Sequence, residues 1–408
     1  MDFEHTTLDN GLTIIAEVNP DAASMAAGFF VRTGSRDETP EVSGVSHFLE
    51  HMVFKGTERR TALDVNREFD AMGANYNAGT SYENTIYYGA VLPEFQDRLL
   101  DLLCDILRPA LRREDFDVEK NVIQEEITLY EDQPVFRTYE KLMSAFFDGH
   151  PLGNEILGTT ESIAALKREQ MLDYFNRRYA PGNVTLVGVG NLDFDAFARQ
   201  AQRLCAHWPT GDTGRHTPPA PGRSGREVLT DAKLVREHVG MMSPAPAHQD
   251  DERFAAMVLA TIVGDATGSR LYYALVDPAI CEEASMSYLP LDGAGAFVTF
   301  LTCDPERAPE AARIAVDELK TFADEGPTEA ELSAAKHKLA SHTTLRGELP
   351  MGRLAAVGSD WVYRGEYVPL TGQIDRLFAV TGEQVRDLAG RYDLTGTMTL
   401  ALGSREDL

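Results

Sequence analysis

The segment SGVSHFLEHMVFKGT, residues 43–57, contains two histidines and a glutamate at a spacing that suits metal chemistry. Residues four apart on a helix lie on one face, so His47 and His51 can point imidazole nitrogens at one ion. The side chains around them are largely apolar, which predicts a buried helix where unpartnered imidazoles would cost free energy. Glu50 stands beside His51, where its carboxylate can take a proton from a metal-bound water. The spacing therefore predicts a metal ion that activates water.

The metal that this pattern favours is zinc, with one Zn²⁺ per chain. The order His-x-x-Glu-His reverses the His-Glu-x-x-His helix of ordinary zinc proteases, and in both orders the glutamate adjoins a ligand histidine. Zinc lowers the pKa of its bound water to about 7, so a nearby carboxylate can complete the deprotonation. A hydrolytic zinc site has three protein ligands and leaves its fourth position to water. A third ligand must therefore come from another segment.

The acidic segment DVEKNVIQEEITLYEDQP, residues 117–134, contains candidates for the third ligand. On a helix, Glu119 and Glu126 are seven residues apart and share a face, whereas Glu125 points about 100° away. We assign Glu126 as the ligand. Glu119 is then a partner that hydrogen-bonds a ligand histidine or the water.

Each of these features also has an explanation that involves no metal. A single buried histidine is more often a core residue hydrogen-bonded to backbone, and a Glu-Glu pair on a helix is usually solvated. The His-x-x-Glu-His spacing also occurs by chance in unrelated chains. It is the combination of the histidine segment with the acidic segment that favours a metal site.

The composition bounds the class of protein that carries this site. A chain of 408 residues with 43% hydrophobic and 25% charged residues fits a globular protein of two domains. The formal net charge of −26 argues against nucleic acid or an anionic membrane as a partner, because both need a basic surface. The acidic excess is explained by solubility, or by an acidic cavity that attracts cationic peptides.

The amino terminus and the cysteines give the expected location. The first twenty residues, MDFEHTTLDNGLTIIAEVNP, lack the basic and apolar regions of a signal peptide, and no later run approaches the ~18 apolar residues of a membrane span. We therefore expect a cytoplasmic protein. The cysteines show no CxxC spacing and are interpreted as buried thiols. They are Cys104, Cys205, Cys281 and Cys303.

A repeat divides the chain near its middle. Residues 208–227, WPTGDTGRHTPPAPGRSGRE, are rich in proline and glycine and have the composition of an exposed linker. Three dipeptides recur across it at a nearly constant offset: Glu169-Gln170 as Glu383-Gln384, Arg178-Tyr179 as Arg391-Tyr392, and Thr185-Leu186 as Thr399-Leu400. We infer a duplication. The expected domains are 1–207, which contains the histidine and acidic segments, the linker 208–227 and a repeat over 228–408.

Hydrophobic periodicity predicts strands and helices in each half. Capping boxes that begin at Thr328 and Thr381 predict helix starts in the second half. The fold class expected is α+β, with two homologous domains, each a mostly antiparallel sheet with helices on one side. The elements predicted are strands at 25–34 and 184–190, a short helix at 46–54, a hairpin at 75–81 and 84–92, helices at 97–108 and 112–131, and a strand at 397–403.

Here the sequence resembles a known family. HFLEH, followed after 74 intervening residues by Glu126, with Glu119 seven residues earlier, is similar to the zinc signature of the pitrilysin family of inverted zinc metallopeptidases. The shorter branch, which resembles mitochondrial processing peptidase, fits best. The similarity continues through GANYNAGTSYENTIYY, ILGTTESI and RRYAPGNVTLVGVGN and covers most of residues 1–200. The second half matches more loosely, in GDATGSRLYYAL.

The resemblance implies a protease subunit in which the domain over 1–207 is catalytic and binds zinc, and the domain over 228–408 is a degenerate repeat that binds no metal. A shift of about 212 residues from the histidine segment places Leu259, Ile262 and Val263 where His47, Glu50 and His51 stand. Family members enclose an unfolded peptide in a clamshell chamber, of which a chain of this length forms one half. The implied partner is a second copy of the chain or a homologous subunit, as a homodimer or a heterodimer.

The resemblance also implies how peptide substrates bind. In the family a substrate pairs as an extra strand beside an edge strand that starts with Asn-Ala, which Asn77 and Ala78 match. We expect these residues and Phe54 to bind substrate. Two departures limit this expectation. Gly79 replaces a frequent aromatic residue, and the Arg and Tyr of the second half that help to hold the substrate carbonyl correspond to Asp277 and Ala284. Arg270 and Tyr288 are the nearest residues of those types and are not assigned to the site.

Three functions compete. The main hypothesis is a zinc metalloendopeptidase that hydrolyses peptides or unfolded segments, with three zinc ligands and Glu50 as general base. The alternative is a noncatalytic or partner-dependent subunit of a peptidase complex, which the missing Arg and Tyr favour. A third is a zinc hydrolase that acts on something other than peptides. The intact ligand set favours the first.

Overall fold

The computed structural model of the chain describes residues 1–211, 213–395 and 397–408 and divides into two compact units. Unit 1 comprises Met1–Thr128, Asn154–His216 and Leu345–Val368. Unit 2 comprises Leu129–Gly153, Thr217–Thr344 and Pro369–Leu408. Each unit therefore takes segments from both halves of the sequence.

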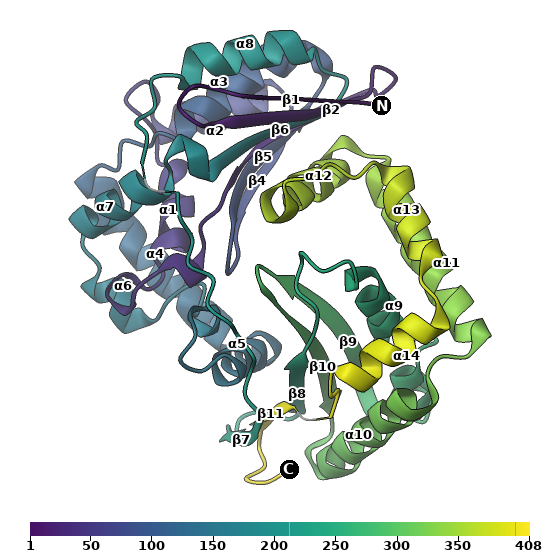
Figure 1. Cartoon of the computed structure of the whole chain (residues 1–408). Helices are drawn as coiled ribbons and strands as arrows, with labels where there is room; N and C mark the ends of the chain where they lie inside the picture. The colour runs from purple at the N-terminus through teal and green to yellow at the C-terminus, as the bar shows by residue number, and fades with distance from the viewer. Residues whose placement is uncertain (212, 396) are drawn as a thin grey trace. The chain divides into compact units, whose positions relative to one another are not determined.

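Unit 1 is built on a six-stranded sheet (Figure 1). The strand order is β1-β2-β6-β3-β5-β4, and every neighbouring pair is antiparallel except β2 and β6. The central strand β3 is buried along its whole length, whereas β4 alternates between exposed and half-buried residues as an edge strand does. The strands are β1 Asp2–Thr7, β2 Thr13–Val18, β3 Met25–Val31, β4 Asn75–Thr80, β5 Thr85–Val91 and β6 Val184–Gly190.

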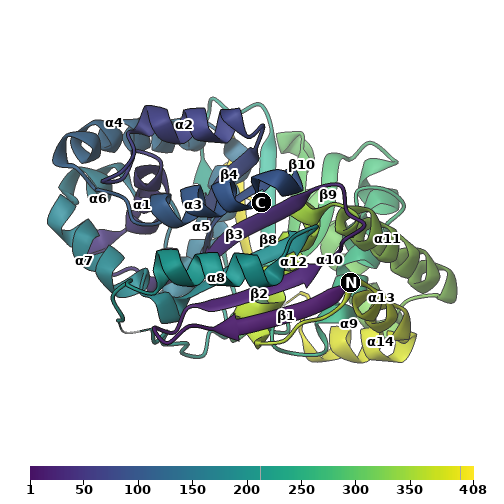
Figure 2. The ribbon, with the colours of Figure 1, turned by 90° about the horizontal axis from the view of Figure 1, so that it is seen from above.

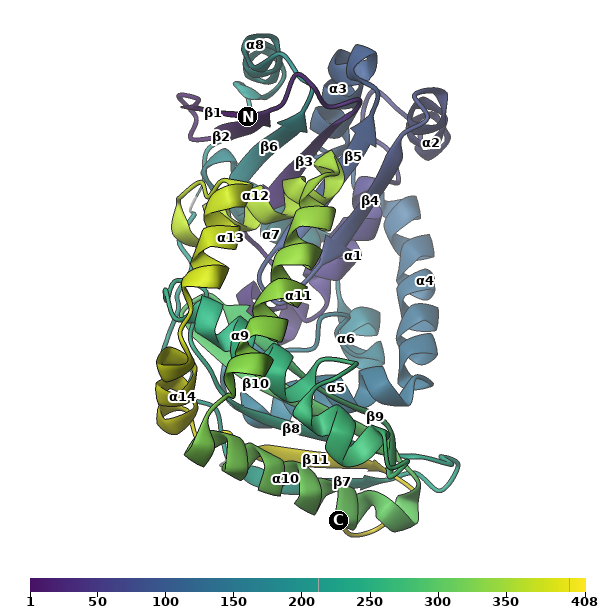
Figure 3. The same cartoon turned by 90° about the vertical axis from the view of Figure 1, so that its right-hand side faces the viewer.

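Helices cover both faces of this sheet. Figure 2 shows α3 (Gln96–Ile106) and α8 (Phe194–Cys205) over one face, and Figure 3 shows α12 (Pro350–Arg364) across the other. Alternate residues of β6 explain the two layers, because Gly188 lies against α8 while Val187 and Val189 pack in one apolar cluster with α12. The expectation of helices on one side only is therefore wrong for this unit.

The remaining helices of unit 1 include the two that carry the predicted metal ligands, α1 and α4. The short helix α1 packs against β4, β5 and α7. The long helix α4 ends just beyond the boundary of unit 1. These helices are α1 Val45–Val53, α2 Ala62–Ala71, α4 Arg113–Glu131, α6 Thr160–Ala165 and α7 Arg168–Arg178.

Unit 2 contains a five-stranded sheet of order β7-β11-β8-β10-β9. Its strands are β7 Gly225–Thr230, β8 Glu237–Pro244, β9 Cys281–Leu291, β10 Ala294–Cys303 and β11 Met398–Gly403. Val239 and Met241 of β8 belong to the large apolar core under the helices, whereas Gly240 lies against α5 on the opposite face. The helices of this unit are α5 Pro134–Phe146, α9 Arg253–Gly264, α10 Ala308–Glu325, α11 Glu329–Gly347, α13 Leu370–Ala379 and α14 Gly382–Arg391.

The two sheets confirm that the domains are homologous. Without β1, the strand order of unit 1 reads β2-β6-β3-β5-β4 and matches β7-β11-β8-β10-β9 position by position. The interval along the chain from the start of β3 to the start of β8 is close to the intervals from α4 to α11 and from α5 to α12. Each half contributes one helix to the other unit, since α5 belongs to unit 2 and α12 belongs to unit 1. No single cut in the sequence separates the compact units.

Most of the predicted elements are confirmed within one or two residues at each end, apart from the strand predicted at 25–34, which ends at Val31. Both predicted capping boxes form, with Thr328 and Glu331 bonded reciprocally at one helix start and Thr381 and Gln384 at the other. All four cysteines are buried free thiols, as expected. Among the described residues, no helix combines the length and apolar composition that crossing a bilayer requires.

Candidate metal centre

A buried carboxylate from a preceding loop positions the histidine helix. The backbone N–H groups of Gly44 and Ser46 donate to Glu38 at 2.6 and 2.7 Å, which satisfies two donors at the first turn of α1. Gly44 adopts a φ of +87°, and an added Cβ there would collide with the backbone of Leu157. Burial raises the pKa of Glu38 to about 8, although the hydrogen bonds from Ser46 and Gly44 oppose the rise. The start of α1 is thus fixed by a side chain outside the helix.

Three side chains converge at one point of unit 1. His47 and His51 project from α1, and Glu126 reaches the same point from α4. The Nε2 atoms of His47 and His51 lie 3.8 and 3.4 Å from the Glu126 carboxylate oxygens. The three ligand atoms lie within 4.8 Å of one another, and in the described part of the chain no other group of three such residues meets this condition. The predicted ligand set is therefore brought together.

The donor set fits zinc. Two imidazole nitrogens and one carboxylate oxygen are common zinc donors, and donors at about 2.1 Å in a tetrahedral arrangement stand roughly 3.4 Å apart. The separations of 3.4 and 3.8 Å match that spacing better than they match direct hydrogen bonds. The Nδ1 atom of His47 is buried and has no hydrogen-bond partner among the described residues. These three side chains could hold one ion and leave a fourth position to water.

Glu119 occupies the place expected of a supporting residue. Its carboxylate accepts a hydrogen bond of 2.9 Å from Nδ1 of His51 and pairs with Lys55 at 2.5 Å. A bond to Nδ1 assigns the proton to that nitrogen and turns Nε2 of His51 toward Glu126. Glu119 is therefore placed to orient His51, and its supporting role stays a prediction. Glu125, from the same helix, is exposed.

The electrostatics of the cluster favour a cation. Burial, followed by repulsion from His51, lowers the pKa of His47 to about 4, so this imidazole is neutral and able to bind a metal. Burial also acts to lower the pKa of His51, but the hydrogen bond to Glu119 and the interaction with Glu126 outweigh it and raise the pKa to about 9. The interaction with His51 lowers the pKa of Glu126 despite burial. The two carboxylates thus stabilise positive charge where the ligands meet.

Glu50 lies next to the ligands and is bound by the edge strand. Its Oε2 atom accepts a hydrogen bond of 2.6 Å from the Thr80 hydroxyl, at the end of β4. Burial raises the pKa of Glu50, while the Thr80 hydrogen bond opposes the rise. A carboxylate with a raised pKa beside a metal site is suited to accept and return a proton.

The predicted substrate-binding residues lie on or beside β4. Asn77 is exposed and Ala78 half-buried, and the outer edge of β4 carries no strand partner in the described part of the sheet. A side chain at Gly79 would meet open space. The Phe54 ring lies 6.2 Å from the ring of Tyr76, itself a β4 residue. The geometry is compatible with a bound strand, and the substrate role of these residues stays a prediction.

In unit 2, Arg270 and Tyr288 are the residues nearest in type to the family's carbonyl-binding pair, and both contact other residues of the same unit. Arg270 pairs with Glu331 at 2.7 Å and lies over the Phe322 ring. The Tyr288 hydroxyl donates to the Pro246 carbonyl at 2.8 Å. At the two family positions, Asp277 is exposed and Ala284 is buried.

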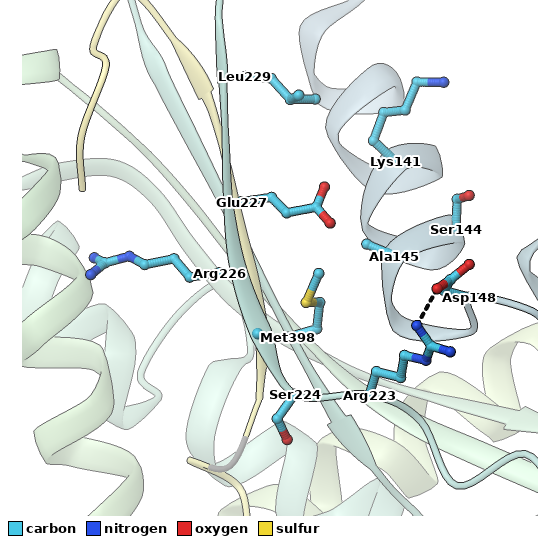
Figure 4. A pocket seen from close by; sticks show the side chains of 11 residues that line it. Lys141, Ser144, Ala145, Asp148, Arg223, Ser224, Arg226, Glu227, Leu229 and Met398 are labelled. Atoms are coloured by element: carbon cyan, nitrogen blue, oxygen red, sulfur yellow. Dashed lines mark hydrogen bonds and ion pairs between the residues drawn. The ribbon is translucent and has the colours of Figure 1, made fainter.

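A hollow of about 570 Å³ lies in unit 2 between α5 and β7 (Figure 4). Its lining carries both signs of charge, and an ion pair joins Arg223 to Asp148. It contains no histidine and no cluster of ligand atoms among the described residues. This hollow has no part in the metal centre.

Sequence reasoning missed two residues of this centre, Glu38 and Thr80. Glu38 accepts hydrogen bonds from N–H groups that lie six and eight residues later in the chain. This distance along the chain exceeds the spacing of a local helix cap. Thr80 lies thirty residues from Glu50. The single available signal was the position of Thr80 at the end of a predicted hairpin strand.

One helix carries a buried and a half-buried histidine, a second helix carries a glutamate, and an edge strand holds another glutamate; this arrangement could hold a metal ion in the manner of an inverted histidine motif. Comparison with known proteins agrees. Residues 13–160 match the model described as Insulinase (Peptidase family M16), and residues 165–339 match the model of the Peptidase M16 inactive domain.

Relatives and solved structures extend the match over nearly the whole chain. An uncharacterized zinc protease of Streptomyces coelicolor is 32% identical over 393 residues, which covers 94% of this chain and 86% of the relative. A protease from Helicobacter pylori has a TM-score of 0.91 at 20% identity, covering 98% of this chain and 99% of that one. A peptidase M16 inactive domain from Pseudomonas fluorescens has a TM-score of 0.90 at 18% identity, covering 100% of this chain and 99% of that one. The chain belongs to peptidase family M16, which confirms the family resemblance drawn from the sequence.

Proposed function

We propose that the chain is a zinc metalloendopeptidase that hydrolyses peptides or unfolded polypeptide segments. The observation that carries the proposal is the convergence of His47, His51 and Glu126 within 4.8 Å, with Glu50 on the same helix as the two histidines. Relatives named zinc proteases support the same class. Zinc held there would supply a Lewis acid that acidifies water and polarises a peptide carbonyl.

The residues of the chain supply the remaining parts of the reaction. Glu50 accepts a proton from the attacking water and donates it to the leaving amine, a role that its raised pKa suits. Glu119 keeps the proton of His51 on Nδ1, so that Nε2 stays available to the metal. The open edge of β4 pairs with the backbone of an extended peptide, and backbone pairing accepts many side-chain sequences.

We also propose that the chain works with a homologous partner, either a second copy or a separate subunit. The Arg and Tyr that the family uses in its second domain are replaced here by Asp277 and Ala284. A partner could supply equivalent groups. The same replacement supports the alternative function, a noncatalytic or partner-dependent subunit.

The decisive experiment measures zinc content and peptide cleavage on the same purified samples. Wild type and Glu50→Gln are each expected to hold one zinc, and Glu50→Gln is expected to lower kcat at least ~100-fold, the usual scale for a lost acid-base group. Glu126→Gln is expected to lose the zinc, whereas the matched control Glu125→Gln, on the exposed side of the same helix, keeps both zinc and activity.

The outcomes separate the candidate functions. Zinc in wild type without cleavage of a mixed peptide pool, alone or with a homologous partner, would favour the noncatalytic subunit. Cleavage that survives in Glu50→Gln would overturn the role of Glu50. Absence of zinc from wild type would overturn the proposal as a whole.

A further inference from the structure

The hydroxyl of Thr80 makes a short hydrogen bond to the side chain of Glu50. The separation from Oγ1 to Oε2 is 2.6 Å, within the short range of charge-assisted O–H···O⁻ bonds. The neighbouring Thr85 hydroxyl donates to the Thr33 carbonyl at 2.9 Å and lies 3.5 Å from Thr80 Oγ1. Because a carboxylate accepts and does not donate, the Thr80 proton is directed at Glu50. One oxygen of the carboxylate is thereby held in a fixed direction.

Thr80 sits where its own position is tightly determined. It is the last residue of β4 and pairs in register with Thr85 across a short connection. Within that connection the Ser81 hydroxyl accepts from the backbone N–H of Glu83 and Asn84 at 3.3 and 3.1 Å. The Ser81 backbone also bonds to the Asn84 carbonyl at 2.8 Å. The end of β4 therefore has little freedom to move.

The loop that precedes α1 clamps this connection from outside. Arg36 pairs with the Glu83 carboxylate at 2.5 Å, and both side chains are about 1% exposed. The Tyr363 hydroxyl donates to the same carboxylate at 2.9 Å and accepts from Asn84 at 2.7 Å. Gly34 lies so close to Ser81 that no Cβ would fit. A buried ion pair of this kind holds its partners in one geometry, because separating them leaves a buried charge unpaired.

The same loop holds the helix that carries Glu50. Two residues after Arg36, Glu38 accepts the N–H groups of Gly44 and Ser46 at the start of α1. Residues 34–38 thus anchor both sides of the contact between Thr80 and Glu50. Such double anchoring buries charged side chains, which costs free energy. It is expected where the position of a side chain matters to within a fraction of an ångström.

We propose that Thr80 is a positioning residue for Glu50: its hydroxyl directs the carboxylate toward the water at the metal centre, and the clamp of Arg36 and Glu83 keeps it there. This inference rests on the proposed function of Glu50 as general base. Thr80 acts through Glu50 and needs no contact with substrate.

The test compares Thr80→Val with Thr80→Ser. Valine keeps the shape and loses the hydroxyl, whereas serine keeps the hydroxyl. Thr80→Val is expected to lower kcat about 10-fold with KM changed by less than about 2-fold, and Thr80→Ser to stay within about 3-fold of wild type. Zinc content is expected to stay at one per chain in both. Thr321→Val, which removes an exposed hydroxyl on α10, is the matched control and is expected to behave as wild type.

A readout independent of activity accompanies the kinetics. Crystal structures of the zinc-free wild type, Thr80→Val and Thr80→Ser show the direction of the Glu50 carboxylate. The carboxylate is expected in its wild-type place in Thr80→Ser and in another rotamer in Thr80→Val. A carboxylate that stays in place in Thr80→Val would overturn the inference, whatever the activity.

Failure of the inference and failure of the proposed function give different results. If wild type cleaves peptides and Glu50→Gln does not, an unchanged kcat in Thr80→Val overturns the inference alone. A Thr80→Val variant that loses zinc, or raises KM as much as it lowers kcat, also overturns it, because the hydroxyl would then support the fold or the substrate site. If Glu50→Gln cleaves as well as wild type, the proposed function of Glu50 fails, and the inference fails with it.

Discussion

The histidine and glutamate cluster of unit 1 has a counterpart in unit 2 that lacks these side chains. Along α9, Met257, Ala260, Thr261 and Gly264 face a small hollow of about 250 Å³, with the same spacing as His47, Glu50 and His51 on α1 and Phe54 just after it. Tyr288 of β9 lines the hollow and pairs with Phe297, as Thr80 pairs with Thr85 in unit 1. The strand, the helix and their contact are present in both units.

The counterpart corrects one detail of the sequence alignment. The expected replacements, Leu259, Ile262 and Val263, are buried in the core of unit 2 and do not line the hollow. A shift of about 212 residues relates the start of β3 to the start of β8. The residues of α9 that line the hollow lie at a slightly smaller offset from the corresponding residues of α1. Helix α9 has 12 residues and α1 has 9, so one constant shift cannot serve both strands and helix. The expectation that unit 2 lacks metal ligands there is unaffected.

The difference teaches that this helix–sheet contact forms with or without histidines and carboxylates on the helix. In unit 2 the helix faces its sheet with apolar side chains, and burial of these supplies the free energy of packing. In unit 1 the histidines and carboxylates occupy buried and half-buried positions, whose desolvation must be compensated by an ion or by each other. The polar cluster is therefore not needed for the helix–sheet contact, which unit 2 makes with apolar side chains.

The largest expected effect is on zinc affinity, and it distinguishes the histidine positions of α1 from the matching position of α9. His47→Ala or His51→Ala should lower zinc affinity by more than the ~10–100-fold that outer-shell substitutions cause, because each removes a ligand. The matched change Thr261→Ala on α9 should leave zinc affinity unchanged. Competition with a chromophoric chelator measures all three. Equal loss in Thr261→Ala would show that the comparison of the two helices is wrong.

A smaller effect is expected from the residue behind the ligand. Glu119→Gln should weaken zinc binding by about 10–100-fold, because the amide supports the orientation of His51 less well than a carboxylate. Glu125→Gln serves as the control on the exposed side of α4. Titration by calorimetry gives both affinities. An affinity unchanged in Glu119→Gln would mean that packing alone orients His51.

Removing the metal should loosen one helix and spare the other. A ligand present at 100 times its Kd stabilises the state that binds it by about 2.7 kcal/mol. Chelation should therefore speed amide exchange in α1 and leave α9 unchanged, as hydrogen exchange with mass spectrometry can show. Faster exchange in both helices would indicate that the units do not respond separately.

The last expected effect is a change in how the free energy of unfolding varies with pH. The pKa of Glu38 in the folded chain is raised to about 8, above its ordinary value of 4.5, so the folded state binds the proton more tightly than the unfolded state does. The contribution is present below about pH 4.5 and is lost as pH rises through about 8, at no more than ~1.4 kcal/mol per pH unit. Glu38→Gln cannot ionise and should show a flatter decline in the free energy of unfolding. Parallel slopes in urea titrations of both proteins would contradict this.

Much of the local structure could be predicted from the sequence. The strands β4, β5 and β6 and the helices α1, α3 and α4 follow from hydrophobic periodicity, and their predicted bounds agree closely with the structure. The spacing of His47 and His51 determines that both lie on one face of a helix. The seven-residue interval of Glu119 and Glu126 does the same for α4. These relations hold because they depend on residues within two helical turns of one another.

Only the tertiary structure decided which distant groups meet. The structure exchanges α5 and α12 between the units, pairs Arg36 with Glu83 and bonds Thr80 to Glu50, and each of these joins residues that stand far apart in the chain. The capping of α1 by Glu38 is shorter in range but exceeds the spacing of a local helix cap. Arg215 shows the same limit, since it lies in the segment predicted as an exposed linker yet pairs with Asp37 as a buried side chain. Periodicity reports which face of an element is buried and is silent about what buries it. The partner of a buried polar group is set by the packing of whole elements, because the desolvation of that group is satisfied wherever the fold brings a complement within hydrogen-bond distance.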